Sequence, residues 1–194
     1  HTVFSDGSAT VREMVQVAEA VGLDSVAITD GAGPETKNLR ERLATIEQVA
    51  RESEIAVLAG VELSIRDAEG HLALPPGDVE QFHLVLATFD HATRSIATDI
   101  PANRSRLVEN VFCAYRAVVE SGHVNVIANP FNLGRFPAPL TPDELPRAYL
   151  RALARLMAAQ GVMFELNATA AWWHPDLPFD EFVLQWKPLL QVFA

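Results

Sequence analysis

The sequence has little cysteine, few basic residues and no long hydrophobic run. Cys113 is the single cysteine among 194 residues, which excludes an internal disulfide and a structural zinc site built from cysteines. An uninterrupted apolar run of about 18 residues, the length that a membrane span needs, is missing. The first residues contain neither the basic nor the apolar region of a signal peptide. Together these absences predict a cytoplasmic protein with no membrane partner.

Positive charge is scarce as well. Fifteen Lys and Arg stand against 25 Asp and Glu, which gives a formal net charge of −10. The phosphate backbone of nucleic acids attracts basic protein surfaces, so we expect no general nucleic-acid binding. A local cationic pocket is still compatible with this balance.

The composition is that of a globular protein. Apolar residues make up 49% of the chain and charged residues 21%, which is enough apolar material for a substantial core. Because the length is close to that of one domain, we expect residues 1–194 to form a single domain. The oligomeric state is left open by the sequence.

Short apolar runs alternate with amphipathic segments along the chain. Helices are predicted over residues 10–22, 35–53, 104–121, 143–160 and 179–186, the last one cut by Pro188. Strands are predicted over residues 25–29, 55–61, 83–89, 124–128 and 162–166. Strands separated by helices or long loops predict an α/β fold with a parallel sheet. Both an open doubly wound sheet and a closed barrel satisfy this pattern.

Polar residues follow the ends of the predicted strands. They are Asp30, Glu62, Asp90, His91, Asn129, Glu165 and Asn167. In both architectures ligands bind at the carboxyl ends of parallel strands, so we expect the functional site at this edge.

The N-terminal segment and the second strand carry metal-type donors. His1 and Asp6 offer an imidazole and a carboxylate within one turn, although the same segment also suits an ordinary turn before a helix with Ser8 or Thr10 as N-cap. Glu62 lies in an apolar stretch, where an unpaired ionised carboxylate is costly to bury. A metal ion is the expected partner of Glu62, and a buried Arg or Lys is the alternative.

Further candidates come from the other strand ends. Asp30 either caps the next helix or orients a catalytic group. Asp90 and His91 are adjacent possible ligands, and Asn129 places an amide at a strand end. Arg135 suits a bidentate contact with a phosphate or carboxylate, although an arginine in a loop is usually just solvated. The remaining histidines are not expected to be ligands: His71, His83, His123 and His174.

Taken in order, these segments resemble the polymerase and histidinol phosphatase (PHP) family of metal-dependent phosphoesterases. The similar segments are residues 1–7, 22–30, 60–62, 86–91, 129–130 and 164–167. The resemblance implies a distorted (β/α)7 TIM-like barrel. It also implies a cluster of two or three divalent ions, drawn from zinc, manganese and iron, at the carboxyl ends of the strands.

By this resemblance His1 matches the second histidine of an opening His-x-His, whose first histidine would lie upstream. Glu62 matches the metal-bridging glutamate, and Asp90 or His91 matches a metal-binding histidine. The expected metal ligands are His1, Asp6, Glu62, Asp90, His91 and Asn129. The expected catalytic residues are Asp30 and Arg135.

The chain departs from the family pattern at three places. Gly31 and Asn129 stand where the family usually has histidine, and the closing Ser-Asp-x-His is absent from the chain as given. We therefore expect a PHP-type barrel without its N- and C-terminal ends. The side-chain carbonyl of Asn129 would suit a harder ion such as Mn²⁺ or Mg²⁺.

The predicted function is metal-dependent hydrolysis of a small phosphomonoester by a metal-activated water, with a second metal or Arg135 stabilising the phosphoryl charge. One alternative is a catalytically impaired PHP-like domain that serves as a binding or structural module, which Gly31 and Asn129 favour. Another is an amidohydrolase-like metal hydrolase, although the predicted strands lack the lysine that such a site would use.

Overall fold

The computed structural model describes residues 1–90, 93, 96, 103–132, 140–167 and 169–194. Two predicted site residues, His91 and Arg135, lie outside these ranges. The chain divides into two compact units. The N-terminal unit contains residues 1–63 and 73–86, and the C-terminal unit contains residues 64–72 and 87–194. The expectation of a single domain stays a prediction.

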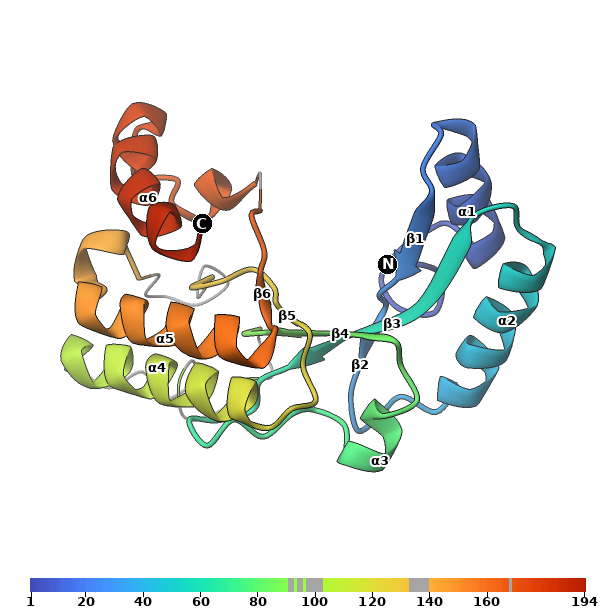
Figure 1. Ribbon diagram of the computed structural model, residues 1–194, viewed down its shortest axis with the longest axis horizontal. Helices are drawn as coiled ribbons and strands as arrows, with labels where there is room; N and C mark the ends of the chain where they lie inside the picture. Colours follow the sequence, from blue (N-terminus) through green and yellow to red (C-terminus); the bar gives the residue numbers. More distant parts are fainter. Residues whose placement is uncertain (91–92, 94–95, 97–102, 133–139, 168) are drawn as a thin grey trace. The chain divides into compact units, whose positions relative to one another are not determined.

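The N-terminal unit combines parallel strands with helices (Figure 1). Its elements are α1 (Val11–Ala20), β1 (Ser25–Ile28), β2 (Gly31–Ala32), α2 (Leu39–Glu52), most of β3 (Ala56–Ser64), α3 (Pro76–Val79) and the start of β4 (Leu84–Thr88). Strand β1 pairs in parallel with the first half of β3, and β2 pairs in parallel with its second half, where Gly31 lies opposite Glu62. This register brings the segment after β1 to the part of β3 that carries Glu62.

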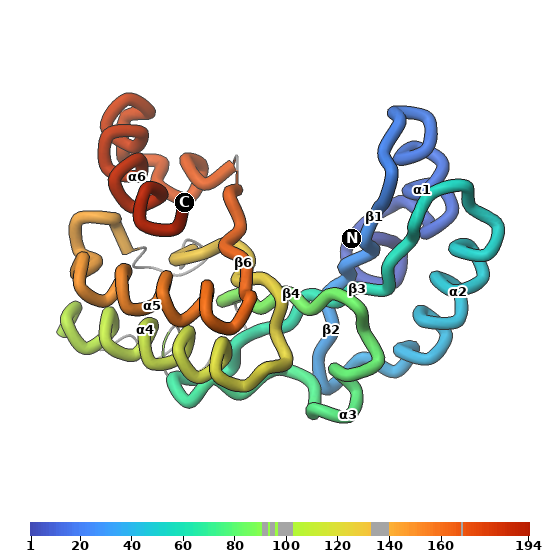
Figure 2. The backbone as a smooth tube through the Cα atoms, in the orientation of Figure 1, coloured from blue at the N-terminus to red at the C-terminus, as the bar shows by residue number. Residues whose placement is uncertain are grey.

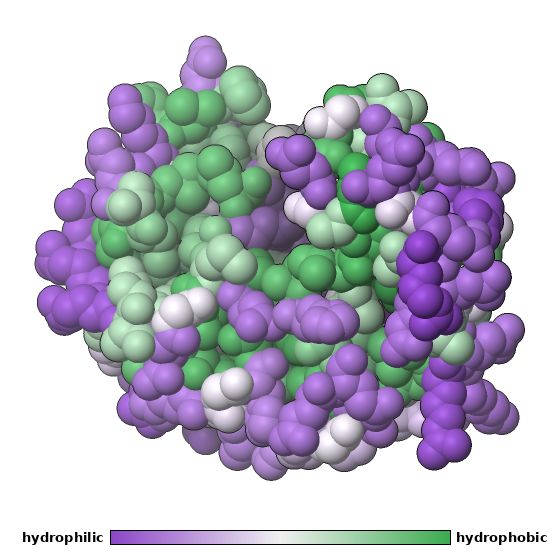
Figure 3. All heavy atoms as spheres, turned by 45° about the vertical axis from the view of Figure 1, so that its right-hand side comes forward, coloured by the Kyte–Doolittle hydropathy of each residue, from purple (hydrophilic) through white to green (hydrophobic). Residues whose placement is uncertain are grey.

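Helices α1 and α2 pack against each other and α1 packs on β1, each by one apolar face. In α1 the buried residues Val11, Val15 and Ala18 recur at helical spacing, and Thr10 forms a capping box with Glu13 that satisfies the first turn. The predicted N-cap role of Thr10 is confirmed. The opposite side of α2 is charged, and Figure 3 shows hydrophilic side chains gathered over this side of the unit.

The C-terminal unit has longer helices and short strands. Its elements are α4 (Arg104–Glu120), β5 (Val126–Ile127), the 3₁₀ helix η1 (Pro142–Glu144), α5 (Arg147–Gln160), β6 (Met163–Phe164), the 3₁₀ helix η2 (Ala170–Trp173) and α6 (Phe179–Phe193). Helices α4 and α5 lie side by side (Figures 1 and 2), α5 also packs on α6, and β5 pairs in parallel with β6. Tyr115 and Phe131 are fully buried at the centre of this unit's aromatic core.

The strands hydrogen-bond in chain order, β1-β3-β4-β5-β6, and β2 also pairs with β3. A doubly wound sheet reverses its strand order at a switch point, whereas a (β/α) barrel places each new strand beside the previous one. The observed order is therefore that of the barrel type, and the predicted α/β class with a parallel sheet is confirmed.

The structure corrects three details of the predicted elements. Helix α6 runs on to Phe193 through Pro188, because Trp186 and Leu189 on either side are buried and hold the helix in place. The helix predicted from residue 143 begins as η1, and α5 starts after Pro146, which cannot donate a helical hydrogen bond. Strand β2 has two residues, too short for any periodic pattern.

Among the described residues, every helix is too short or too polar to cross a membrane.

Candidate functional site

His1 lies between two carboxylates of the N-terminal unit. Its Nδ1 atom is 2.6 Å from Asp6 Oδ1 and 3.2 Å from Ser5 Oγ, whereas its Nε2 atom is 3.8 Å from Glu62 Oε1. The structure thus brings together three of the predicted metal ligands, two from the N-terminal loop and one from β3. Asp6 and Ser5 occupy one ring nitrogen, so the other nitrogen faces Glu62.

Gly7 allows the N-terminal loop to turn back on itself. The carbonyl oxygen of Thr2 accepts hydrogen bonds from the backbone N–H groups of Ser5 and Gly7, each at 3.0 Å. A Cβ atom at position 7 would lie 2.2 Å from the carbonyl oxygen of His1, closer than any real contact. Glycine is therefore required for the tight turn that presents Asp6 to His1.

Asp30 is fully buried and anchors the same loop. Its carboxylate accepts hydrogen bonds from Thr2 Oγ1 at 2.7 Å, from Ser5 Oγ at 2.6 Å and from the Thr2 backbone N–H. Burial acts to raise the pKa of Asp30, but these hydrogen bonds and the nearby Arg42 charge outweigh burial and lower the pKa. Asp30 is thus held ionised and fixes Thr2 and Ser5 in the loop that follows His1.

Arg42 is a site residue that the sequence analysis missed. It is fully buried, and its guanidinium donates to the carbonyl oxygens of Asp30 at 3.1 Å, Gly31 at 3.1 Å and Phe4 at 3.3 Å. Burial lowers the pKa of Arg42, and the Asp30 charge acts in the opposite direction. The available signal was its spacing: Arg42 lies four residues before the buried Ile46, on the inward face of α2.

Gly31 faces the ring of His1. A Cβ atom built at this position would meet only the Cε1 atom of His1, at 3.9 Å, which is an ordinary contact distance. A Cβ atom at position 31 would therefore fit beside the His1 imidazole. This is the position at which the family resemblance leads one to expect a histidine.

Glu62 is positioned by the close packing of β3 on its neighbours. Its backbone N–H donates to the carbonyl oxygen of Asp30 at 3.2 Å. Two residues earlier, a Cβ atom at Gly60 would lie 2.7 Å from Thr29 Cγ2 and within 3.2 Å of the Ile28 and Leu84 carbonyl oxygens. The absent side chain of Gly60 lets β3 lie close enough to place Glu62 beside His1.

Asp90 and Asn129 belong to the C-terminal unit. Asp90 accepts a hydrogen bond from Ser64 Oγ, and its backbone N–H donates to Thr93 Oγ1 at 3.1 Å. Because His91 lies outside the described residues, the choice between Asp90 and His91 as a ligand stays a prediction.

Asn129 lies in a turn after β5 that has a left-handed backbone and is held by hydrogen bonds. Its φ is 45°, in the left-handed region, and Phe131 two residues later has φ 60°. The backbone N–H of Asn129 donates to Glu165 Oε2 at 2.6 Å, and its side-chain oxygen accepts from Asn167 Nδ2 at 2.7 Å. Such backbone conformations in non-glycine residues cluster at functional sites. These hydrogen bonds bring together three of the polar residues predicted at strand ends, Asn129, Glu165 and Asn167, beside β5 and β6.

Buried Tyr115 supports the same turn from α4. Its phenol accepts a hydrogen bond from the Phe131 backbone N–H at 2.8 Å. Burial raises the pKa of Tyr115, against a lowering effect of that hydrogen bond, so the phenol stays neutral.

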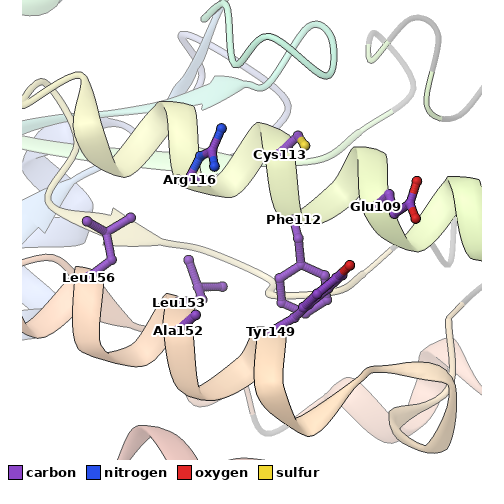
Figure 4. A pocket seen from close by; sticks show the side chains of 8 residues that line it. All are labelled: Glu109, Phe112, Cys113, Arg116, Tyr149, Ala152, Leu153 and Leu156. Atoms are coloured by element: carbon purple, nitrogen blue, oxygen red, sulfur yellow. The ribbon is translucent and has the colours of Figure 1, made fainter.

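The C-terminal unit contains several cavities, and two are among the larger ones that its described residues line. One, of about 340 Å³, is bordered by Glu165, Asn167 and several aromatic side chains. The other, of about 310 Å³, lies between α4 and α5, with Phe112 and Tyr149 projecting into it (Figure 4). None of the described residues lining the second cavity is a predicted site residue, so only the first coincides with the predicted strand-end site.

A separate acidic group lies in the loop after β3. The ligand-type atoms of Asp67, Glu69 and His71 all lie within 4.8 Å of one another, and His71 Nδ1 is 2.8 Å from Asp67 Oδ2. The hydrogen bond with Asp67 and then its charge raise the pKa of His71. His71 was not expected to be a ligand, and exposed groups of this kind are common on protein surfaces without a metal.

Comparison with known proteins gives two kinds of relative. A probable phosphatase of Thermoanaerobacter sp. strain X514 is 26% identical over 179 residues, which cover 86% of this chain and 62% of the relative. The DNA polymerase/3′-5′ exonuclease PolX of Bacillus subtilis strain 168 is 27% identical over 179 residues, which cover 88% of this chain and 28% of PolX. The chain thus spans less than two thirds of the length of these relatives.

A solved structure and a family model also match this chain. A chain in the cryo-EM structure of archaeal ribonuclease P with mature tRNA aligns with a TM-score of 0.48 and 15% identity, over 92% of this chain and 66% of that one. The PHP domain matches residues 1–169, which is most of the chain and includes every predicted metal ligand. The similarity first seen in the strand-end motifs is thereby confirmed, and the chain belongs to the PHP domain family.

Proposed function

We propose that this chain is a metal-dependent phosphoesterase that hydrolyses a small phosphomonoester. The observation that carries the proposal is the placement of His1, whose Nε2 atom faces Glu62 while its Nδ1 atom is held by Asp6. The name of the Thermoanaerobacter relative, a probable phosphatase, supports the same class of reaction.

The donor set fits a divalent transition metal. Imidazole and carboxylate are the ligand types that zinc, manganese and iron share. We propose His1 and Glu62 as ligands from the N-terminal unit. Because a metal-binding histidine usually donates its second ring N–H to a carboxylate, the contact between Asp6 and Nδ1 favours an orienting role for Asp6.

The other residues of the N-terminal unit hold this arrangement in place. Asp30 fixes Thr2 and Ser5, and Arg42 ties the carbonyl oxygens of Phe4, Asp30 and Gly31 together. We assign Asp30 and Arg42 as positioning residues, because their polar atoms bind the loop and are buried away from solvent.

Bound divalent ions would lower the pKa of a water molecule and place positive charge beside the phosphoryl oxygens. Asp90, His91 and Asn129 remain proposed ligands from the C-terminal unit. Arg135 remains the proposed cationic contact to the phosphoryl group, for which its planar guanidinium is suited.

The test is the substitution Glu62→Ala. We expect a folded protein that has lost bound metal, measured by elemental analysis, and has lost at least about 100-fold of its turnover of an aryl phosphate, because a ligand has been removed. Glu80→Ala is the matched control, since it removes an exposed glutamate that is neither a proposed ligand nor part of the loop group. Retained activity in Glu62→Ala, or loss of metal in the control alone, would contradict the proposal.

A catalytically impaired binding module is the second candidate, and Gly31 is the observation that favours it. Position 31 faces His1, but glycine has no side chain that could bind a metal ion. If the site is depleted, Gly31→His should raise the metal content and the turnover above those of the unaltered chain. If the site is already active, the unaltered chain should bind metal and hydrolyse the aryl phosphate without this change.

A further inference from the structure

The cavity of about 340 Å³ in the C-terminal unit has an aromatic wall. Trp173, Phe179, Phe182 and Trp186 line it, and three of these belong to α6. Positions 179, 182 and 186 recur at helical spacing, so their side chains share one face of the helix. The ring centroids of Phe182 and Trp186 are 5.3 Å apart, and those of Phe179 and Phe182 are 6.4 Å apart with nearly parallel planes. The wall is a row of planar surfaces already packed in place.

Trp186 contributes an unused hydrogen-bond donor. Its side chain is 5% exposed, and its indole Nε1 is buried with no hydrogen-bond partner among the described residues. Buried polar groups nearly always have a partner, so an orphaned N–H in a residue that lines a cavity points to an acceptor on a ligand. An aliphatic occupant would leave this donor unsatisfied.

The polar border of the cavity is formed by Glu165 and Asn167. The side chain of Asn167 is already hydrogen-bonded within the protein, because its oxygen accepts from Thr169 and its amide donates to Asn129. Glu165 Oε2 accepts from the Asn129 backbone N–H, but a carboxylate has about four acceptor positions. Glu165 is therefore suited to accept a hydrogen bond from an amino group on the edge of a ring.

We propose that this cavity binds a planar heteroaromatic ring of the nucleobase type, with both an acceptor and an amino donor on its edge. Stacking on the aromatic wall would hold the ring, and Trp186 Nε1 and Glu165 would recognise its edge. The cavity volume falls in the usual range for small-molecule sites. If this ring is part of the substrate, the phosphoester carries a nucleobase-type ring; that second step rests on the proposed phosphoesterase function.

Tryptophan fluorescence provides the test. Trp173 and Trp186 line the cavity, whereas Trp172 is 80% exposed and does not. The titration uses the full chain with Trp172→Phe, so that the two remaining tryptophans report on the cavity. Adenosine is the probe and ribose is its control, because the two differ by the base. We expect saturable quenching by adenosine and none by ribose.

Two variants in the same background separate binding from nonspecific quenching. Phe179→Ala removes part of the wall at a residue that is 68% exposed, so the core is spared; adenosine affinity should fall at least about fivefold. Trp186→Phe keeps a ring and removes the N–H, and affinity should fall about two- to tenfold. Circular dichroism establishes that each variant is folded.

The proposal is overturned if adenosine gives no saturable quenching, if ribose quenches equally, or if both folded variants bind adenosine as the parent does. Adenosine has no phosphate, and the titration is run with a chelator present. A failed phosphatase assay therefore leaves this result unaffected, and failure of the cavity proposal leaves the metal-site proposal standing.

Discussion

At the scale of single residues, the buried side chains of Asp30 and Arg42 matter most for the N-terminal loop, and the sequence did not reveal that they lie together. Asp30 and Arg42 are both fully buried, and together they hold Thr2, Phe4 and Ser5 in the loop that follows His1. Arg42 donates to the backbone carbonyl of Asp30, and the charges of the two side chains also attract each other. Removal of the buried carboxylate would leave the buried Arg42 charge less compensated.

We therefore expect Asp30→Asn to lower the free energy of unfolding by about 3 kcal/mol. The asparagine amide would face the hydroxyl and N–H donors of Thr2 and Ser5, and the Arg42 charge would lose the nearby negative charge. Urea unfolding measures the change, with Asp180→Asn at an exposed position as control. An unchanged unfolding midpoint would show that the carboxylate is not needed to hold the loop.

Burial of His174 predicts that the stability of the folded chain depends on pH. It is 5% exposed, packs near the rings of Phe182 and Trp186, and burial lowers its pKa. The unfolded chain takes up a proton near the ordinary pKa of about 6.5, whereas the folded chain resists. Stability that is present above that pH is therefore lost as the pH falls below it.

The loss should reach up to about 1.4 kcal/mol per pH unit in this window, until the lowered folded pKa is passed. His174→Phe should flatten this slope, and His83→Gln, at an exposed histidine, should retain it. Unfolding free energies measured between about pH 7.5 and pH 5.5, one unit on each side of the ordinary pKa, test this expectation. Equal slopes in the parent and His174→Phe would contradict the assignment.

At the scale of elements, the fold depends on how closely β3 approaches its neighbours. The parallel pairing of β2 with β3 places Glu62 opposite Gly31. Gly60 lies two residues before Glu62 on β3, in the part that follows the pairing with β1. The space at Gly60 is enclosed by Thr29, Ile28 and Leu84, so the strand spacing is set by a missing side chain.

Gly60→Ala should consequently destabilise the chain by about 1–3 kcal/mol through overpacking, and should weaken metal binding by displacing Glu62. Gly77→Ala is the matched control, because a Cβ atom there meets nothing within 4 Å. Thermal unfolding and metal titration measure both effects. If Gly60→Ala unfolds and binds metal like the control, close packing of β3 does not position Glu62.

At the scale of the whole molecule, the net charge of −10 is unfavourable for the anionic substrate that we propose. Acidic surfaces repel phosphates, but bound divalent ions reverse the potential locally. The relative PolX is named as a DNA polymerase and exonuclease, which makes nucleic-acid binding worth testing on this chain.

We expect no saturable binding of a fluorescent single-stranded oligonucleotide up to about 100 µM protein at physiological salt, the weak end of nonspecific affinities. Fluorescence anisotropy with and without Mn²⁺ measures it, so that binding created by the metal is recognised. Micromolar affinity that weakens steeply with salt in the metal-free protein would contradict the expectation.

The sequence determined the kind and order of the main elements and the edge at which polar residues gather. Periodicity does this because each helix or strand must bury one apolar face, and parallel strands bring their carboxyl ends to one edge. Asn129, Asn167 and Glu165 were found from that pattern, and His1 and Asp6 were found from their donor types within one turn; in the structure both groups meet within their units.

Only the tertiary structure decided what each polar group does. Arg42 appeared to lie on an ordinary amphipathic helix, and the Asp30 carboxylate appeared able to serve chemistry; burial turned both into supports for the loop. Helix α6 continued through Pro188 because buried Trp186 and Leu189 outweigh the lost hydrogen bond. Contacts between residues far apart in the chain create these roles, and a local pattern of residue types carries no record of which groups meet.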